Sequence, residues 1–293
     1  MDSFESTVPI QVYRGDHATI YKGVRAGRTV AIKIANVGSA RVERINRESK
    51  IGQRLNHRNI VPFLGCCGPR HELPYMVSEW MPNGNARVYA SKDADENVDC
   101  IRIVRPSIEL CVHFNANAAP LPSVETDDQT CRSSQSNILI DADGTARIPH
   151  FALEYISGDV QTGSRPPPMR WSAPEVLEGD NHEVSSDMYS YACVILEIIT
   201  DTEPFSKYNH LYRLHRLIRE GLRPEFPQSE LAWRRGLTNP VCALWKLMHE
   251  CWAAHPDRRP TAVQARDRML EIWSERRARA RVQGAGGAIP TVI

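Results

Sequence analysis

The sequence predicts an α+β fold in which a small β-rich part with one helix precedes a larger, mainly helical part. Between residues 12 and 34, short runs rich in β-branched and aromatic side chains alternate with glycine turns, which is typical of a strand meander. Further along, residues 187–200 and 239–252 carry apolar side chains at helical spacing. Of the 293 residues, 42% are hydrophobic and 24% are charged, so the chain can bury the core of one domain of this kind.

The β-rich part begins with strands expected over residues 20–23 and 29–34. Residues 39–55 then change to helical spacing, because Val42, Ile45 and Ile51 fall on one face with charged residues between them. Two further strands are expected at 59–68 and 73–80, and the polar connector at 81–85 ends this part of the chain.

In the remainder, residues 187–200 and 239–252 are apolar enough to form core helices. Residues 137–148 are predicted to form a hairpin, since two β-rich runs flank a DADG turn. After Trp273 the chain becomes rich in arginine and then in glycine and alanine. We expect residues 273–293 to form a basic, flexible tail.

Composition argues against several classes of function. The formal net charge of +1 provides no field that would attract nucleic acid or an anionic membrane. No segment has the character of a signal peptide or a membrane span, and Glu197 interrupts the longest apolar run. The eight cysteines include no CxxC pair and lie mostly in apolar runs, as buried thiols would in a reducing compartment. We therefore expect a cytoplasmic or nuclear protein that is neither secreted nor membrane-spanning.

The first indication of chemistry is a lysine on an expected strand. Lys33 ends the run Val-Ala-Ile-Lys after a glycine turn, and Glu48 follows on the expected helix. A lysine that binds phosphate needs such an anion to hold its ammonium group in place. An isolated run of this kind would more often be an exposed lysine on an edge strand, so the motifs that follow it decide the interpretation.

Five further motifs follow in order: EWMPNGN at 79–85, NILID at 137–141, WSAPE at 171–175, SSDMYSYACVILE at 185–197 and HPDRRPT at 255–261. Together with Lys33 and Glu48, this order resembles the protein kinase family, and its tyrosine-kinase-like branch in particular. The resemblance covers residues 10–272. It implies a two-lobed kinase domain with a β-rich N-lobe at 10–80 and a mainly helical C-lobe at 84–272.

The resemblance also implies roles for individual residues. Lys33 matches the lysine that contacts the nucleotide phosphates, and Glu48 matches its partner on the helix. Asn137 matches the asparagine that holds the second magnesium ion, although a simple turn asparagine is the alternative. Three residues match the architecture of the fold: Glu175 and Arg259 as an ion pair, and Asp187 as the carboxylate that caps the catalytic loop. The expected nucleotide-binding residues are Gly15, Ile20, Ala31, Lys33, Glu48, Glu79, Met81 and Leu139.

Departures from the family pattern occur where phosphate and metal bind. Only Gly15 remains of three glycines that let backbone amides approach phosphate, because Tyr13 and Ala18 stand at the other two positions. The magnesium-binding Asp-Phe-Gly becomes His-Phe-Ala, which places His150 at the aspartate position. An imidazole is a poor ligand for a hard cation that prefers oxygen, so we expect weak binding of Mg²⁺.

The catalytic loop departs further. Counting back from Asn137 places Arg132 at the position of the base and Ser134 at that of the loop lysine. Arginine cannot accept a proton, because its pKa lies far above neutral. A positioned base contributes roughly 10² to 10⁴-fold in rate, so we expect no intact catalytic residue. Residues 104–136 are either a degenerate loop or an error in the gene model, and the sequence leaves both explanations open.

These observations lead to the hypothesis of a pseudokinase that binds ATP weakly or not at all and acts through a protein partner as a signalling scaffold or regulator. The rival hypothesis is an active Ser/Thr or Tyr kinase that transfers the γ-phosphate of ATP to proteins. A structure with Asp127, Asp128 or Asp141 pointing into the cleft near Asn137 would favour this rival. A third hypothesis is a nonfunctional gene product. Oligomeric state and pathway are left open.

Overall fold

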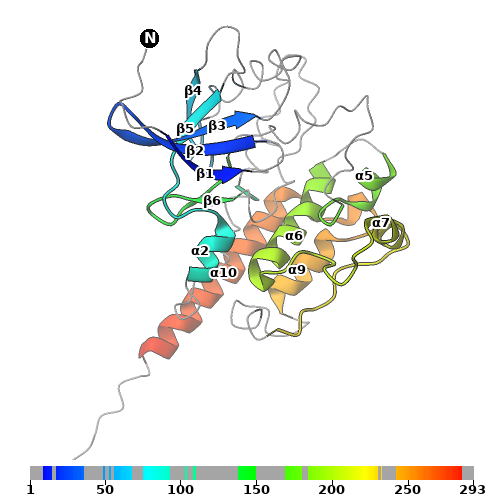
Figure 1. Cartoon of the computed structure of the whole chain (residues 1–293). Coiled ribbons are helices and arrows are strands. Elements are labelled where there is room, and N and C mark those ends of the chain that lie inside the picture. Colours follow the sequence, from blue (N-terminus) through cyan, green and yellow to red (C-terminus); the bar gives the residue numbers. More distant parts are fainter. Residues whose placement is uncertain are drawn as a thin grey trace, which may run out of the picture. The chain divides into compact units, whose positions relative to one another are not determined.

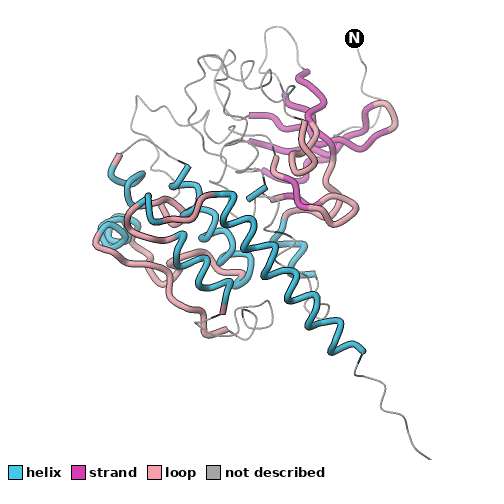
Figure 2. The backbone as a smooth tube through the Cα atoms, turned by 180° about the vertical axis from the view of Figure 1, so that it is seen from behind, coloured by secondary structure: helices cyan, strands magenta, loops and turns pink. Residues whose placement is uncertain are grey.

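A computed structural model of the chain describes residues 9–14, 18–35, 49, 53, 56–67, 75–92, 103, 108–109, 138–149, 169–179, 184–229, 232 and 242–285. The chain divides into two compact units. The first comprises Met1–Tyr89 with Ser136–Pro167, and the second comprises Ala90–Gln135 with Pro168–Ile293. The strands lie in the first unit and the long helices in the second (Figure 2). The predicted α+β fold is thereby confirmed.

The first unit is built on a five-stranded antiparallel sheet with the strand order β1-β2-β3-β5-β4 (Figure 1). Strand β4 begins later than predicted because it follows Pro62, which has no N–H to donate to a ladder. The strands are β1 (Ile10–Arg14), β2 (Ala18–Arg25), β3 (Arg28–Ala35), β4 (Phe63–Cys67) and β5 (Tyr75–Glu79).

One face of this sheet forms an apolar core. Val30, Ile32 and Val77 are buried there, and partly buried side chains from β2, β3 and β5 pack against them. Because side chains alternate along a strand, the intervening residues of β3 lie on the opposite face. The edge strand β1 is exposed throughout and has a β-bulge between Gln11 and Tyr13.

A short hairpin completes the first unit. β6 (Leu139–Ile140) pairs with β7 (Ala146–Arg147) inside the segment predicted to form a hairpin. Its flanks are bonded to other parts of the unit: Ile148 N–H donates to the Asn59 carbonyl over 2.8 Å, and Ala86 N–H donates to the Ile138 carbonyl over 2.7 Å. These bonds attach the hairpin to the first unit.

The second unit is mainly helical (Figure 1). Its central helix is α6 (Val184–Thr200), whose residues from Ser186 to Ile199 are all buried. α6 packs against α9 (Ala243–Cys251), and α9 packs against α10 (Ala262–Ala285). Helices α6 and α9 correspond to the two predicted core helices. No helix within the described residues is long and apolar enough to cross a membrane.

Several shorter elements complete the described helices. α5 (Pro174–Glu178) packs against α7 (Leu211–Arg219), and the single turn η3 (Pro256–Arg258) contacts α6. α2 (Ala86–Lys92) follows the connector after β5. Of the helix predicted at 39–55, only Ser49 and Gln53 are described, and both are helical.

The C-terminal part of α10 differs from the expected tail. The helix continues past Trp273 to Ala285, because the segment is rich in alanine and arginine, which are strong helix formers. The expected tail therefore begins as helix, and residues 286–293 lie outside the described part of the chain.

Candidate functional site

The face of the sheet opposite the apolar core carries three of the residues expected to bind nucleotide. Lys33 lies directly between Ile20 on β2 and Met76 on β5, and Ala31 lies opposite Ser78. Directly opposed residues of antiparallel strands share a face. The structure therefore brings Ile20, Ala31 and Lys33 together, and all three are partly buried.

Ser78 was not among the predicted site residues. It lies on the same face, opposite the small side chain of Ala31, and directly precedes Glu79. The sequence gives one indication of Ser78, namely its position next to Glu79. Placing Ser78 opposite Ala31 also requires the pairing register of β3 and β5, which the spacing of residues along the chain does not define.

The connector after β5 lies against the hairpin. Ile140 N–H donates to the Gly84 carbonyl over 2.8 Å, and the Asn83 side-chain amide donates to the Asp141 carbonyl over 2.6 Å. Leu139 forms a β-bridge with Asn85. The structure thus places the predicted Leu139 beside the connector that begins with Met81.

The main-chain N–H of Met81 is the most informative atom of this connector. Met81 is buried, and its N–H has no acceptor among the described residues. The N–H groups before it are bonded, Glu79 to the Pro62 carbonyl over 3.0 Å and Trp80 to the Thr29 carbonyl over 3.3 Å. A buried N–H without an acceptor is uncommon and is available to a ligand.

These residues fit an adenine nucleotide. The Met81 N–H, which has no acceptor among the described residues, can donate to a ring nitrogen. Ile20 and Ala31 offer apolar surface, and Lys33 can meet phosphate oxygens. Glu79 has an exposed side chain, so its predicted contribution would come from the main chain. Tyr13, which the resemblance matches to the first glycine of the family, lies opposite Ile20 in the register and is 58% exposed.

Asp141 ends the NILID motif and is one of the three carboxylates nearest the altered base position, none of which has the spacing of the family. It is buried, and its Oδ1 accepts hydrogen bonds from the N–H groups of Asp143 over 3.0 Å and Thr145 over 2.8 Å. Its Oδ2 accepts one from Arg147 Nε over 2.8 Å. The carboxylate is therefore engaged in the turn between β6 and β7.

One of the two donors matched to magnesium does not fit that ion. Asn137 supplies an amide oxygen, as the family does at this position, but His150 supplies an imidazole where Mg²⁺ requires a carboxylate oxygen. Within the described ranges no group of three or more His, Cys, Asp and Glu side chains is placed to hold a metal. Several predicted site residues lie outside the described residues: Gly15, Glu48, Arg132, Ser134, Asn137 and His150, together with Asp127 and Asp128.

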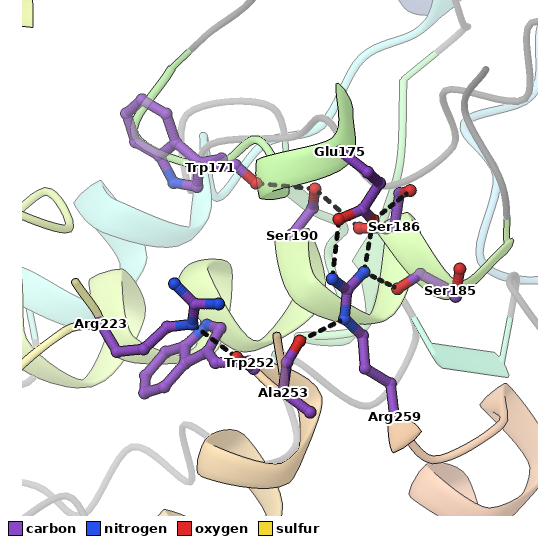
Figure 3. Close-up of polar contacts among 9 residues, drawn as sticks. All are labelled: Trp171, Glu175, Ser185, Ser186, Ser190, Arg223, Trp252, Ala253 and Arg259. Carbon is purple, nitrogen blue, oxygen red and sulfur yellow. Dashed lines mark hydrogen bonds and ion pairs between the residues drawn. The ribbon is translucent and has the colours of Figure 1, made fainter. Parts of the chain in front are cut away.

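The second unit brings Glu175 and Arg259 together (Figure 3). Arg259 donates from its two terminal nitrogens to the two carboxylate oxygens of Glu175, over 2.6 Å and 2.8 Å. It also donates to the carbonyls of Ala253 and Ser185, and Ser186 Oγ donates to Glu175 over 2.8 Å. Burial alone would raise the pKa of the Glu175 carboxyl, but the hydrogen bonds and charge of Arg259 outweigh it and hold the pKa below its usual value.

Arg259 also lies over a buried aromatic ring. Its guanidinium is 5.5 Å from the ring centroid of Tyr189, and that of Arg223 is 5.6 Å away. Asp187, the third predicted architectural residue, is buried on the same helix α6. The catalytic loop that it would cap lies outside the described residues, so this role stays a prediction.

Arg170 anchors the segment before α7 and was not predicted. Its guanidinium donates to the carbonyls of Phe205 over 2.6 Å and Tyr208 over 2.9 Å. Its neighbour Trp171 donates from Nε1 to Glu197 over 3.1 Å, which explains the acidic residue inside an otherwise apolar helix. No local pattern identifies Arg170, because its partners lie more than thirty residues away.

Residues 9–269 match the model of a family described as protein tyrosine and serine/threonine kinase. The match covers most of the chain, so the chain belongs to this family. Domains of this family generally bind ATP and Mg²⁺.

The relatives include proteins named as tyrosine kinases and proteins named as serine/threonine kinases. The chain is 26% identical over 269 residues to Tyrosine-protein kinase SPK-1 of Girardia tigrina, covering 88% of this chain and 51% of the relative. It is 24% identical over 283 residues to Serine/threonine-protein kinase STY17 of Arabidopsis thaliana, covering 94% and 46%. It is 30% identical over 208 residues to Wall-associated receptor kinase-like 6 of the same plant, covering 66% and 31%. The chain thus spans about half the length of the first two relatives and less of the third.

Proposed function

We propose that this chain is a pseudokinase domain of the tyrosine-kinase-like branch that binds ATP weakly, without a requirement for Mg²⁺, and acts as a signalling scaffold or regulator. The observation that carries the proposal is the loss of two carboxylates at once. Arg132 stands at the position of the base and His150 at that of the metal ligand. Arg132 cannot accept the proton of a substrate hydroxyl, and an imidazole at His150 is a poor ligand for the Mg²⁺ that neutralises the phosphate charge.

The described residues support this proposal in two ways. Asp141, a candidate substitute for the base, has its carboxylate oxygens engaged by three donors. The nucleotide face retains Lys33, and the Met81 N–H has no acceptor among the described residues. Both features favour residual binding of ATP. Tyr13 and Ala18 at glycine positions lower the expected affinity, because side chains there keep backbone amides away from phosphate.

Branch, partner and location belong to the same proposal. Relatives named as tyrosine kinases and as serine/threonine kinases both align with the chain, which is what a tyrosine-kinase-like domain would give. A domain without transfer would act by contact, so we propose a protein partner rather than nucleic acid or membrane, in the cytoplasm or nucleus. The near-zero net charge agrees with this choice of partner.

A thermal-shift titration with ATP tests the proposal. ATP at ten times its dissociation constant would stabilise the native state by about 1.4 kcal/mol, which corresponds to a shift of a few degrees in a domain of this size. We expect this shift with and without Mg²⁺, its loss in Lys33→Ala, and its retention in the exposed control Arg28→Ala. A shift that requires Mg²⁺ would contradict the proposed metal independence.

The rival function is transfer of the ATP γ-phosphate to protein hydroxyls, and the kinase names of the relatives favour it. It predicts phosphate incorporation into a generic protein substrate by the purified chain, abolished by Lys33→Ala. If Asp141 were the base, Asp141→Asn would also abolish transfer. Incorporation above background with this dependence on Lys33 would overturn the pseudokinase proposal.

A further inference from the structure

Helix α7 is firmly attached to the second unit by one face. Leu214 and Ile218 are buried with Phe205, and partly buried residues of α5 and the adjoining loops pack against them. The His215 ring Nε2 lies 3.0 Å from the Leu177 carbonyl. Arg219 Nε donates to Glu178 over 2.7 Å. Because both contacts reach α5, the outward side of α7 has a fixed orientation.

The outward side combines an exposed tyrosine with arginines. Tyr212 is 84% exposed, and its neighbour Leu211 is 44% exposed. At about 100° per residue, Arg216 lies one turn from Tyr212 on the same side, and Arg213 lies beside it. The helix LYRLHRLIR contains three arginines and no acidic residue. We call Leu211, Tyr212, Arg213 and Arg216 the α7 outer face.

Acidic side chains among the described residues neutralise only part of the positive charge on the α7 outer face. Arg216 pairs with Glu220 over 3.3 Å, and both side chains are largely exposed. Exposed pairs of this kind contribute little and exchange partners readily. Arg213 has no hydrogen bond or ion pair with any other described residue. Among the described residues, the guanidinium of Arg213 therefore has no carboxylate partner, and the exposed ring of Tyr212 lies beside it.

We infer that the α7 outer face binds an acidic segment of a partner protein, whose carboxylates meet Arg213 and Arg216 and whose apolar side chain covers Tyr212 and Leu211. Tyrosine and arginine are the residue types that most often carry the binding energy of interfaces. Charge complementarity selects an acidic segment. The surface would serve an active kinase and a pseudokinase equally, so the inference goes beyond the proposed function.

A protein segment fits this surface better than the other anionic partners. The net charge of the chain is +1, so it has no overall positive potential that would concentrate a polyanion such as nucleic acid or a membrane. The α7 outer face is also confined to two turns of one helix. That area suits a short peptide with two or three acidic residues.

Selection from a phage-displayed library of random 16-residue peptides tests the inference with the whole chain as bait. We expect enrichment of peptides that combine Asp or Glu with an aromatic or aliphatic residue. Their affinity, measured by fluorescence anisotropy on synthetic copies, should fall about tenfold or more in Tyr212→Ala and in Arg213→Glu. Lys246→Glu, the same charge change at an exposed site on α9, should alter it by less than about twofold.

The variants change exposed side chains, so unfolding temperatures equal to that of the wild type will show that the fold is intact. The inference is wrong if acidic peptides are not enriched, or if Arg213→Glu binds them as tightly as the wild type. It is equally wrong if sedimentation shows a homodimer that Tyr212→Ala dissociates. Vesicles of anionic lipid that bind the wild type and not Arg213→Glu, with no acidic peptide selected, would assign the surface to a membrane instead.

Discussion

Arg259 places a guanidinium with 0% side-chain exposure against the carboxylate of Glu175. Removing one partner of a buried ion pair leaves the other charge without compensation, which typically costs 3–5 kcal/mol, whereas replacing both with apolar residues can be neutral. We therefore expect Arg259→Ala to lower the free energy of unfolding by about 3–5 kcal/mol, measured by urea denaturation at pH 7. Glu175→Leu combined with Arg259→Met should recover much of the loss.

Arg268 provides the matched control. It also contacts both carboxylate oxygens of a glutamate, Glu250, but the side chains are 35% and 51% exposed. Exposed pairs contribute about 0–1 kcal/mol, so Arg268→Ala should cost no more than that. Equal losses in Arg259→Ala and Arg268→Ala would show that burial does not govern the contribution of these pairs.

Cys193 and Cys251 are buried on α6 and α9, whereas Cys242 is partly accessible. Burial raises the pKa of both buried thiols, so neither supplies the reactive thiolate at neutral pH. Brief treatment of the native chain with iodoacetamide, followed by mass spectrometry, should modify Cys242 and leave Cys193 and Cys251 unmodified. In urea all three should react, and modification of Cys251 in the native chain would contradict its burial.

The sequence could predict the pairing of Glu175 with Arg259, because both lie in motifs whose order resembles a known family. It could not predict the bonds of Arg170, or that the Met81 N–H finds no acceptor within the described part of the chain. Those depend on which distant carbonyls the fold brings near, and residue type says nothing about them. The site residues in the catalytic loop stay predictions, since that loop lies outside the described residues.

At the scale of elements, the β6–β7 hairpin depends on one side chain. Asp141 accepts hydrogen bonds from two amides of its turn and from Arg147. Asp141→Ala leaves these donors without acceptors, which typically costs about 1–3 kcal/mol. Asp141→Asn keeps a carbonyl oxygen for the two amides and should cost less. Hydrogen exchange of the Thr145 amide should accelerate in the alanine variant more than in the asparagine variant, and identical rates would contradict this role.

Helices and strands were predicted unequally well for physical reasons. α6 and α9 were apparent from long apolar segments. Strands β4 and β5 were predicted, but β4 begins later than the apolar run suggests, because Pro62 has no N–H to pair with a neighbouring strand. α7 was not singled out, since its nine residues carry only two buried apolar side chains among arginines. Its attachment to α5 supplies the stability that the isolated segment lacks.

At the scale of the whole molecule, two compact units imply that unfolding need not be a single step. The predicted nucleotide residues that the structure describes lie in the first unit, and the Glu175–Arg259 pair lies in the second. ATP should therefore raise the midpoint of one calorimetric transition, and Arg259→Ala should lower that of another. If a single transition responds equally to both changes, the units unfold together.

Glu175 contributes to the dependence of the unfolding free energy on pH. Its pKa in the folded chain lies below the usual value near 4.5, so the unfolded chain binds more protons at Glu175 as the pH falls through that range. The stabilisation by this carboxylate is thus complete above pH 5 or so and is lost as the pH falls toward the folded pKa. Other carboxylates also titrate there, and a comparison with Glu175→Gln cancels their effect.

We therefore expect the difference in unfolding free energy between the wild type and Glu175→Gln to be largest at pH 7 and to narrow between pH 5 and pH 3, measured by urea denaturation at each pH. Glu220→Gln, which removes an exposed partner of Arg216, should differ little from the wild type at every pH. A gap for Glu175→Gln that stays constant over this range would mean that the carboxylate stabilises the second unit by packing and hydrogen bonds alone, without a contribution from its charge.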